Sequence, residues 1–160
     1  MQRIKFSVLM AVYARDNASI FRKALESVYR NTVRPDEFVL VVDGPLGIDL
    51  RRVISDFEDV AGFHVFWLEQ NVGLARALNY GLQKVSHEVI FRADADDINL
   101  EHRFSLQLSE FTRGADVVGG VILESDEDSR PIAIRKLPLE HVEIADFTLM
   151  RRPMSHMLAA

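Results

Sequence analysis

The feature that most constrains the fold is a regular alternation of short apolar runs with segments of helical periodicity. Four apolar runs, each ending at a polar or glycine-containing turn, cover residues 4–13, 37–42, 63–68 and 89–91. Between these runs, apolar residues recur every three or four positions, as they do in amphipathic helices. Strands that alternate with helices are joined by right-handed crossovers. The pattern therefore predicts an α/β fold with a Rossmann-like, mostly parallel sheet flanked by helices.

Beyond the fourth run the pattern predicts a less regular region. Apolar spacing indicates a helix over 100–111, a strand over 115–123, a hairpin partner over 132–135 and a helix over 138–150. The last ten residues have an extended pattern. An unpaired apolar edge near residues 154–158 would favour a homodimer.

Composition limits the classes of protein to which the chain can belong. Its 160 residues fit a single domain that is long enough to bury a core. The net charge of −5, without a basic block, argues against a nucleic-acid partner, and the lack of cysteine excludes disulfides and thiolate metal sites. No stretch approaches the roughly 20 apolar residues of a transmembrane segment.

The fourth apolar run ends in three carboxylates, Asp94, Asp96 and Asp97. In an open α/β sheet, ligands bind at the carboxyl ends of the strands. Side-chain alternation along an extended chain predicts that Asp94 and Asp96 point to one side and Asp97 to the other. Two carboxylates on one side suit Mg²⁺ or Mn²⁺, which complete their coordination with water and phosphate. The alternative is an acidic loop that only caps the next helix, through Asp97 or Asn99.

Further residues follow the other predicted strands and would meet the carboxylates at the same edge of the sheet. Tyr13 would lie against a nucleotide base, and Asp43 would accept the imide N–H of uracil. Gly73 permits close backbone approach, and Arg76 would reach a phosphate from the start of a helix. Singly, each residue also fits an ordinary turn or surface position. Together they favour a nucleotide site.

Six segments, in this order and spacing, resemble the family 2 glycosyltransferases: residues 7–13, 24–28, 35–37, 41–46, 71–79 and 92–98. The Asp-Gly-Pro-Leu sequence at residues 43–46 is similar to the bacterial branch that builds exopolysaccharide and lipopolysaccharide, which includes amylovoran-type enzymes. The resemblance implies a GT-A fold, in which a Rossmann-like nucleotide-binding domain carries a metal-binding Asp-x-Asp motif.

Carried over position by position, the resemblance implies that Ala11 and Tyr13 line the base pocket and that Asp43 binds the base. Gly73 and Arg76 would border the nucleotide.

The same resemblance implies roles for the charged residues at the end of the fourth apolar run and just after it. Asp94 would approach the ribose or the donor sugar, and Asp96, with Asp94 beside it, would coordinate the Mn²⁺ or Mg²⁺ that bridges the diphosphate. Arg92 would add a contact to a phosphate or to the sugar. The family's acceptor-binding region and catalytic base would lie beyond Ala160, so the catalytic residue stays unknown. We expect residues 1–160 to form a single nucleotide-sugar-binding domain without that region.

The implied reaction is metal-dependent, inverting transfer of a sugar from a UDP-sugar donor to a saccharide or lipid-linked saccharide acceptor. Its implied place is the cytoplasm or the inner face of the plasma membrane. One alternative is a nucleotidyltransferase that makes nucleotide sugars, but residues 10–17 lack the glycine and lysine that would hold a triphosphate. The other is a non-catalytic nucleotide-binding or assembly domain. The fingerprints of dinucleotide-binding and P-loop proteins are absent.

Overall fold

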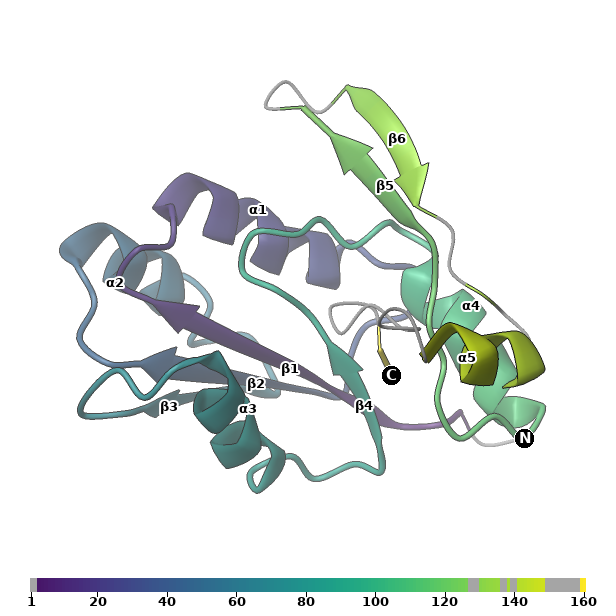
Figure 1. Cartoon of the computed structure of the whole chain (residues 1–160). Helices are drawn as coiled ribbons and strands as arrows, with labels where there is room; N and C mark the ends of the chain where they lie inside the picture. Colours follow the sequence, from purple (N-terminus) through teal and green to yellow (C-terminus); the bar gives the residue numbers. More distant parts are fainter. Residues whose placement is uncertain (1–2, 127–129, 136–137, 139–140, 149–158) are drawn as a thin grey trace.

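The computed structural model describes residues 3–126, 130–135, 138, 141–148 and 159–160, and its core is a four-stranded parallel sheet (Figure 1). The strands lie in the order β3-β2-β1-β4. Their bounds are Phe6–Tyr13 for β1, Glu37–Asp43 for β2, Phe63–Trp67 for β3 and Val89–Arg92 for β4. Every neighbouring pair in this sheet is parallel, which confirms the predicted α/β fold.

Helices cover both faces of this sheet, because both faces of its central strands are apolar. On β1, the side chains of Phe6, Val8, Met10 and Val12 enter one core cluster, and Leu9 enters the other. The first cluster packs beneath α1 (Ala18–Tyr29), α2 (Ile48–Ser55) and α4 (Arg103–Thr112), and the second beneath α3 (Leu74–Leu82). Continuous apolar runs are typical of parallel strands that are buried on both sides.

An asparagine side chain caps the N-terminus of α1. Asn17 is its N-cap, and the Asn17 Oδ1 accepts from the backbone N–H groups of Ser19 (2.9 Å) and Ile20 (3.2 Å). Those two donors have no partner inside the helix, so the cap stabilises its first turn. Asn17 therefore forms the cap, and Ser19 is one of the residues that it caps.

A glycine brings the loops after β2 and β3 into contact. Gly44 has φ +90°, and a Cβ atom at this position would lie 2.6 Å from the backbone nitrogen of Asn71. Only glycine tolerates both the left-handed conformation and this approach without strain. Gly44 therefore allows the two loops to pack directly against each other.

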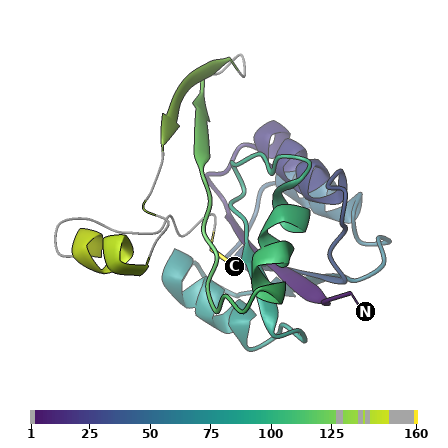
Figure 2. The same ribbon diagram turned by 90° about the vertical axis from the view of Figure 1, so that its right-hand side faces the viewer.

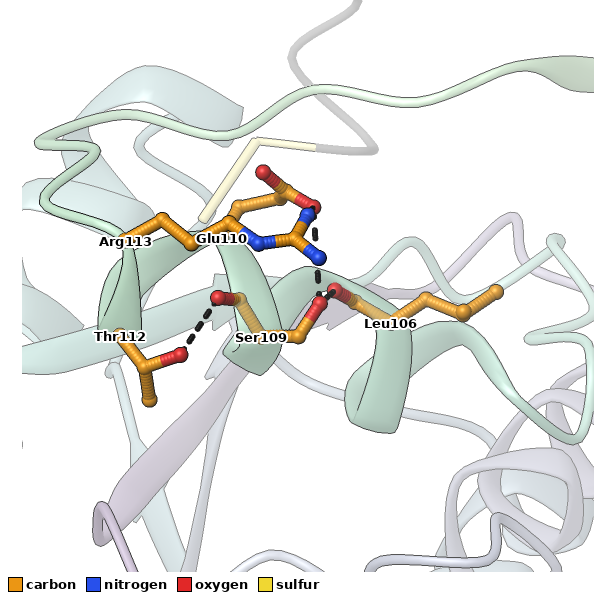
Figure 3. A network of polar contacts seen from close by, with 5 residues as sticks. All are labelled: Leu106, Ser109, Glu110, Thr112 and Arg113. Atoms are coloured by element: carbon orange, nitrogen blue, oxygen red, sulfur yellow. Dashed lines mark hydrogen bonds and ion pairs between the residues drawn. The ribbon is translucent and has the colours of Figure 1, made fainter.

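The last turns of α4 are held by local polar contacts (Figure 3). The hydroxyl groups of Ser109 and Thr112 donate to the carbonyl oxygens three residues before them, Leu106 and Ser109, at 2.6 Å each. Arg113 and Glu110 form an ion pair of 2.6 Å next to these bonds. Hydroxyls that bond back to the helix backbone in this way are common on exposed helix faces.

The region after α4 differs from the prediction in part. The predicted strand over 115–123 is shorter and later, since β5 spans Ile122–Ser125. It pairs with β6 (Pro131–Arg135) in the expected antiparallel hairpin, which projects from the body in both views (Figures 1 and 2). The predicted helix over 138–150 is α5 (His141–Thr148). The predicted dimer edge near 154–158 lies outside the described residues.

Residues 159 and 160 form backbone hydrogen bonds with β4 and with Val118. The N–H of Arg92 donates to the carbonyl of Ala159 (2.9 Å), and Ala160 and Val118 exchange two backbone hydrogen bonds of 3.0 Å. The extended segment predicted for the last ten residues lies mostly outside the described residues. None of the helices in the described part of the chain has the length and apolar character needed to cross a bilayer.

Candidate functional site

The strand order reverses beside β1. From β1 the chain passes to β2 and then β3 on one side, and it returns to form β4 on the other side. The carboxyl ends of β1 and β4 therefore border the crevice in which open α/β sheets bind ligands. Leu9 is the partner of Arg92 in the register, so the residues that follow β4 come level with the last residues of β1.

A cavity of about 400 Å³ opens at this point, which is within the usual range for small-molecule sites. Its walls come from the ends of β1, β2 and β4 and from the loop before α3. The lining residues are Ala11, Val12, Tyr13, Asp16, Asp43, Asn71, Gly73, Leu74, Asp94, Ala95 and Asp96. The predicted residues Ala11, Tyr13, Asp43, Gly73, Asp94 and Asp96 thus meet at one edge of the sheet.

Three carboxylates converge at the β4 side of this cavity. One oxygen each from Asp94, Asp96 and Asp97 lies within 4.8 Å of the others. The prediction that Asp97 points away from the other two was wrong, because the chain turns at Ala95 and Asp96 and does not stay extended. The set of three carboxylate oxygens fits a hard divalent cation such as Mg²⁺ or Mn²⁺.

The acidic loop does not cap the following helix. The N-cap position of α4 is His102, whose side chain makes no capping hydrogen bond. Asn99 instead accepts a hydrogen bond from the Arg103 Nη1. The alternative role proposed for Asp97 and Asn99 as helix caps is therefore wrong.

The two predicted arginines lie outside the cavity lining. Arg92 is buried, and its guanidinium donates to the Asp94 carboxylate and to the carbonyl of Ala93. It lines a separate apolar groove beside α3. Arg76 lies exposed in the first turn of α3. Contacts from either arginine to a nucleotide stay predictions.

Asp43 has a structural role that the sequence did not reveal. Its side chain is buried, and its two carboxylate oxygens accept from the N–H groups of Val72 (2.7 Å) and Gly73 (3.0 Å). Its carbonyl accepts from the side-chain amide of Asn71 (3.2 Å). Gly73, at φ +87°, has open space where a Cβ would lie. The glycine is therefore needed for its backbone conformation, and Asp43 fixes the loop that forms this wall.

Sequence reasoning missed Asp16 as a site residue. The Asp16 Oδ2 accepts from the N–H of Tyr13 (2.8 Å), and the N–H of Asp16 donates back to the Tyr13 carbonyl (3.1 Å). This closed turn directs the chain away from β1 and leaves the Tyr13 ring 41% exposed at the cavity. An aspartate three residues after the end of a strand is the signal that would have indicated this turn.

Two carboxylates at this edge of the sheet, Asp97 and Asp16, have a raised pKa. Burial raises the pKa of Asp97, and the charges of Asp96 and Asp94 raise it further, while Arg103 and Arg92 oppose the change. Burial also raises the pKa of Asp16 against the hydrogen bond from Tyr13, which lowers it, and the charges of Asp96 and Asp94 add smaller increases. Mutual repulsion of this kind is relieved when a cation binds.

The charged side chains in the cavity lining are all acidic. The lining includes four aspartates, Asp16, Asp43, Asp94 and Asp96, and no lysine, arginine or histidine. Like charges that face one cavity repel each other, and the repulsion grows as the distance between them decreases. The acidic lining disfavours an anion that enters without a cation.

Comparison with known proteins agrees with this geometry. Residues 7–157 match the family model described as glycosyl transferase family 2. The chain belongs to this family. Among family 2 glycosyltransferases, the amylovoran biosynthesis glycosyltransferase AmsE of Erwinia amylovora is 36% identical over 154 residues, which cover 95% of this chain and 58% of AmsE. The bacterial family 2 assignment made from the sequence is confirmed.

A second relative is the Escherichia coli UDP-Gal:alpha-D-GlcNAc-diphosphoundecaprenol beta-1,3-galactosyltransferase. It is 43% identical over 113 residues, which cover 71% of this chain and 41% of the enzyme. This family 2 chain thus spans 58% and 41% of the lengths of the two relatives.

Solved structures support the fold. The crystal structure of S. aureus TarS residues 1–349 in complex with UDP superposes with a TM-score of 0.66. The match has 20% sequence identity and covers 85% of this chain and 38% of the TarS chain. It confirms the GT-A fold that the resemblance implied.

Proposed function

We propose that this family 2 chain binds a UDP-sugar together with Mn²⁺ or Mg²⁺ and is the donor-binding domain of an inverting glycosyltransferase. The observation that carries the proposal is the single cavity shared by Tyr13, Asp43, Asp94 and Asp96. An aromatic ring, a buried carboxylate and an acidic cluster meet there at the point where the strand order reverses.

The base end of the donor would lie between Tyr13 and Asp43. The exposed Tyr13 ring offers a stacking surface, and stacking on an aromatic side chain tolerates any base. Each Asp43 oxygen accepts one backbone N–H and has a second lone pair for the imide N–H of uracil. The choice of UDP also rests on two similar proteins, the E. coli UDP-Gal enzyme and TarS, whose crystal structure contains UDP.

The diphosphate end would lie over the acidic loop. Asp94, Asp96 and Asp97 would hold the divalent cation, which would neutralise the charge of the departing diphosphate. The four carboxylates of the cavity, without a basic partner in its lining, make metal-free binding of a nucleotide diphosphate unfavourable. Metal dependence is therefore part of the proposal.

In the proposed reaction, an acceptor hydroxyl attacks the anomeric carbon in line with the leaving diphosphate. A general base removes the hydroxyl proton. The residue that acts as this base stays unknown. The acceptor would be a saccharide or lipid-linked saccharide, and we expect the enzyme to work in the cytoplasm or at the inner face of the plasma membrane.

Titration calorimetry tests the proposal. UDP is expected to bind the folded protein in the presence of Mn²⁺ and not in its absence. The variant Asp96→Asn should lose this metal-dependent binding, and its stability should change little, because Asp96 is exposed. Asp49→Asn, at an exposed position on α2, is the control and should bind as the wild type.

Two results would contradict the proposal. Folded wild-type protein that takes up no UDP with Mn²⁺ present would exclude a donor-binding domain. UDP binding that is unchanged in Asp96→Asn would instead support a non-catalytic nucleotide-binding or assembly domain in which the acidic loop has no metal.

A further inference from the structure

The acidic loop, residues 93–99, is joined at both ends to one guanidinium. The Arg103 Nη2 donates to the backbone carbonyl of Arg92 (2.8 Å), which is the last residue of β4. The Arg103 Nη1 donates to the side-chain oxygen of Asn99, at the far end of the loop. One side chain therefore fixes the distance between the two ends of the segment that carries the three carboxylates.

Arg103 is itself held in place by neighbours on β4 and α4. Its Nε donates to the side-chain oxygen of Gln107 (2.9 Å), and Gln107 donates in turn to the carbonyl of Gly119 (2.9 Å). The guanidinium carbon lies 5.9 Å from the ring centroid of Phe91 and 5.6 Å from that of Phe104. These contacts restrict the rotamers of the side chain.

Asn99 is also held in place, by a residue of α1. Its backbone N–H (2.9 Å) and its side-chain amide (3.3 Å) both point to the hydroxyl oxygen of Ser27, a buried residue of α1. The side-chain oxygen of Asn99 is thereby oriented towards Arg103. The far end of the loop is anchored on α1 and α4 together.

We propose that Arg103 is a positioning residue for the metal site. Through Arg92 and Asn99, the contacts of Arg103, named here the Arg103 clamp, hold residues 93–99 in the turn that brings the carboxylates of Asp94, Asp96 and Asp97 together. The inference rests on the proposed function, because the purpose of the clamp is to present these carboxylates to a divalent cation.

The charge of Arg103 is suited to this position. Burial lowers its pKa to about 10, and Asp97 and Asp94 oppose the shift, so the group stays cationic at neutral pH. A cation behind the acidic loop reduces the repulsion among the carboxylates while they await a metal. Lysine would keep the charge. Its single nitrogen cannot reach the three acceptors of the planar guanidinium, which belong to Arg92, Asn99 and Gln107.

The variant Arg103→Lys tests the clamp, with Mn²⁺ alone as the probe. We expect the affinity of the folded protein for Mn²⁺, measured by electron paramagnetic resonance, to fall about 10–100-fold, as for other residues that orient metal ligands. Arg113→Lys, at the other end of α4 (Figure 3), is the matched control and should leave this affinity unchanged. Folded Arg103→Lys protein that binds Mn²⁺ like the wild type would show that Arg103 only stabilises the fold.

A second variant removes the contact between Arg103 and the side chain of Asn99. Asn99→Ala leaves Arg103 in place and should weaken Mn²⁺ binding by a similar factor. Because both variants break the same connection, the double variant is expected to bind about as weakly as either single variant. Fully additive losses in the double variant would overturn the clamp.

A measurement without metal separates this inference from the proposed function. Backbone amides of residues 94–97 should exchange with deuterium faster in Arg103→Lys and Asn99→Ala than in the wild type, while those of β1 should not change. Unchanged exchange in the acidic loop would contradict the clamp even if Mn²⁺ binds. Wild-type protein that binds no Mn²⁺ would disprove the proposed function, and the exchange rates would still decide whether the clamp exists.

Discussion

The carboxylate of Asp43 accepts a hydrogen bond of 3.0 Å from the backbone N–H of Gly73, thirty residues further along the chain. This bond joins the end of β2 to the start of α3 and fixes one wall of the cavity. The same carboxylate is the proposed acceptor for the base of the nucleotide. A substitution of Asp43 would therefore disturb the wall and the binding contact together, and the cleaner tests lie at other residues.

Tyr13 offers such a test, because its ring is exposed and contributes little to the core. Tyr13→Ala should weaken UDP binding by about 1–3 kcal/mol, or roughly 5–150-fold, since stacking on an aromatic ring has this magnitude. Calorimetry with Mn²⁺ present gives the affinity, and thermal unfolding should show little change. Tyr13→Phe keeps the ring and should bind as the wild type. Equal affinities for all three proteins would exclude stacking on Tyr13.

The affinity for Mn²⁺ should depend on pH. The pKa values of Asp97 and Asp16 are raised, so their carboxylates take up protons at a higher pH than ordinary aspartates, and these protons compete with the cation. Binding should weaken as the pH falls from 7.5 towards the usual pKa of aspartate, about 4. Titrations of Mn²⁺ at a series of pH values give the dependence.

The variant Asp97→Asn serves as the control for that experiment. It removes one of the three carboxylates proposed to hold the cation, so its Mn²⁺ affinity should be lower at neutral pH. It also removes one of the two competing protons, so the affinity should depend less on pH. A raised pKa also means that the ionised Asp97 lowers the stability of the folded state, so this variant should unfold no more easily than the wild type at pH 7. An affinity that is constant between pH 7.5 and 5 would contradict the raised pKa values.

Glu37, at the opposite end of β2, should make stability sensitive to acid. Burial by itself would raise its pKa, but hydrogen bonds from Ser7 and Ser86 outweigh that effect and lower the pKa of this buried carboxylate. A lowered pKa contributes stability that is present above the pKa of the unfolded chain and is lost as the pH falls through the folded value. Glu37→Gln should cost about 1–3 kcal/mol at pH 7.

Urea denaturation at neutral and acidic pH checks this expectation. The difference in stability between the wild type and Glu37→Gln should shrink as the pH falls below the ordinary pKa of a glutamate. Glu58→Gln, at an exposed position after α2, is the control and should follow the wild type at every pH. A difference between wild type and Glu37→Gln that stays constant across the pH range would show that the charge of Glu37 contributes nothing.

Gly44 should tolerate no larger residue. In Gly44→Ala, the left-handed backbone and the contact with the Asn71 backbone would destabilise the protein by about 1–3 kcal/mol. The displaced Asn71 loop should also weaken UDP binding. Gly47→Ala is the matched control, because Gly47 has φ −68° and open space at the Cβ position, and its cost should stay below about 1 kcal/mol. Similar unfolding midpoints for the two variants would contradict this role of Gly44.

The amino-acid sequence alone determined the architecture of the sheet and the edge that carries the site. Apolar runs of strand length between helical periodicities specify a parallel sheet, because only helices on both faces bury such strands. The end of each run then places Tyr13, Asp43 and Asp94 at one edge, and the structure has all three in one cavity.

Only the tertiary structure decided which side chains complete the site. Asp97 joins the acidic cluster because the chain turns after β4, and Asp16 enters the cavity because it folds back on Tyr13. Arg92 faces a different groove, and Arg103 contacts Arg92 and Asn99 across the loop. Periodicity reports which face of an element is buried. It carries no information on how a turn bends or on which partner a long polar side chain finds across the fold.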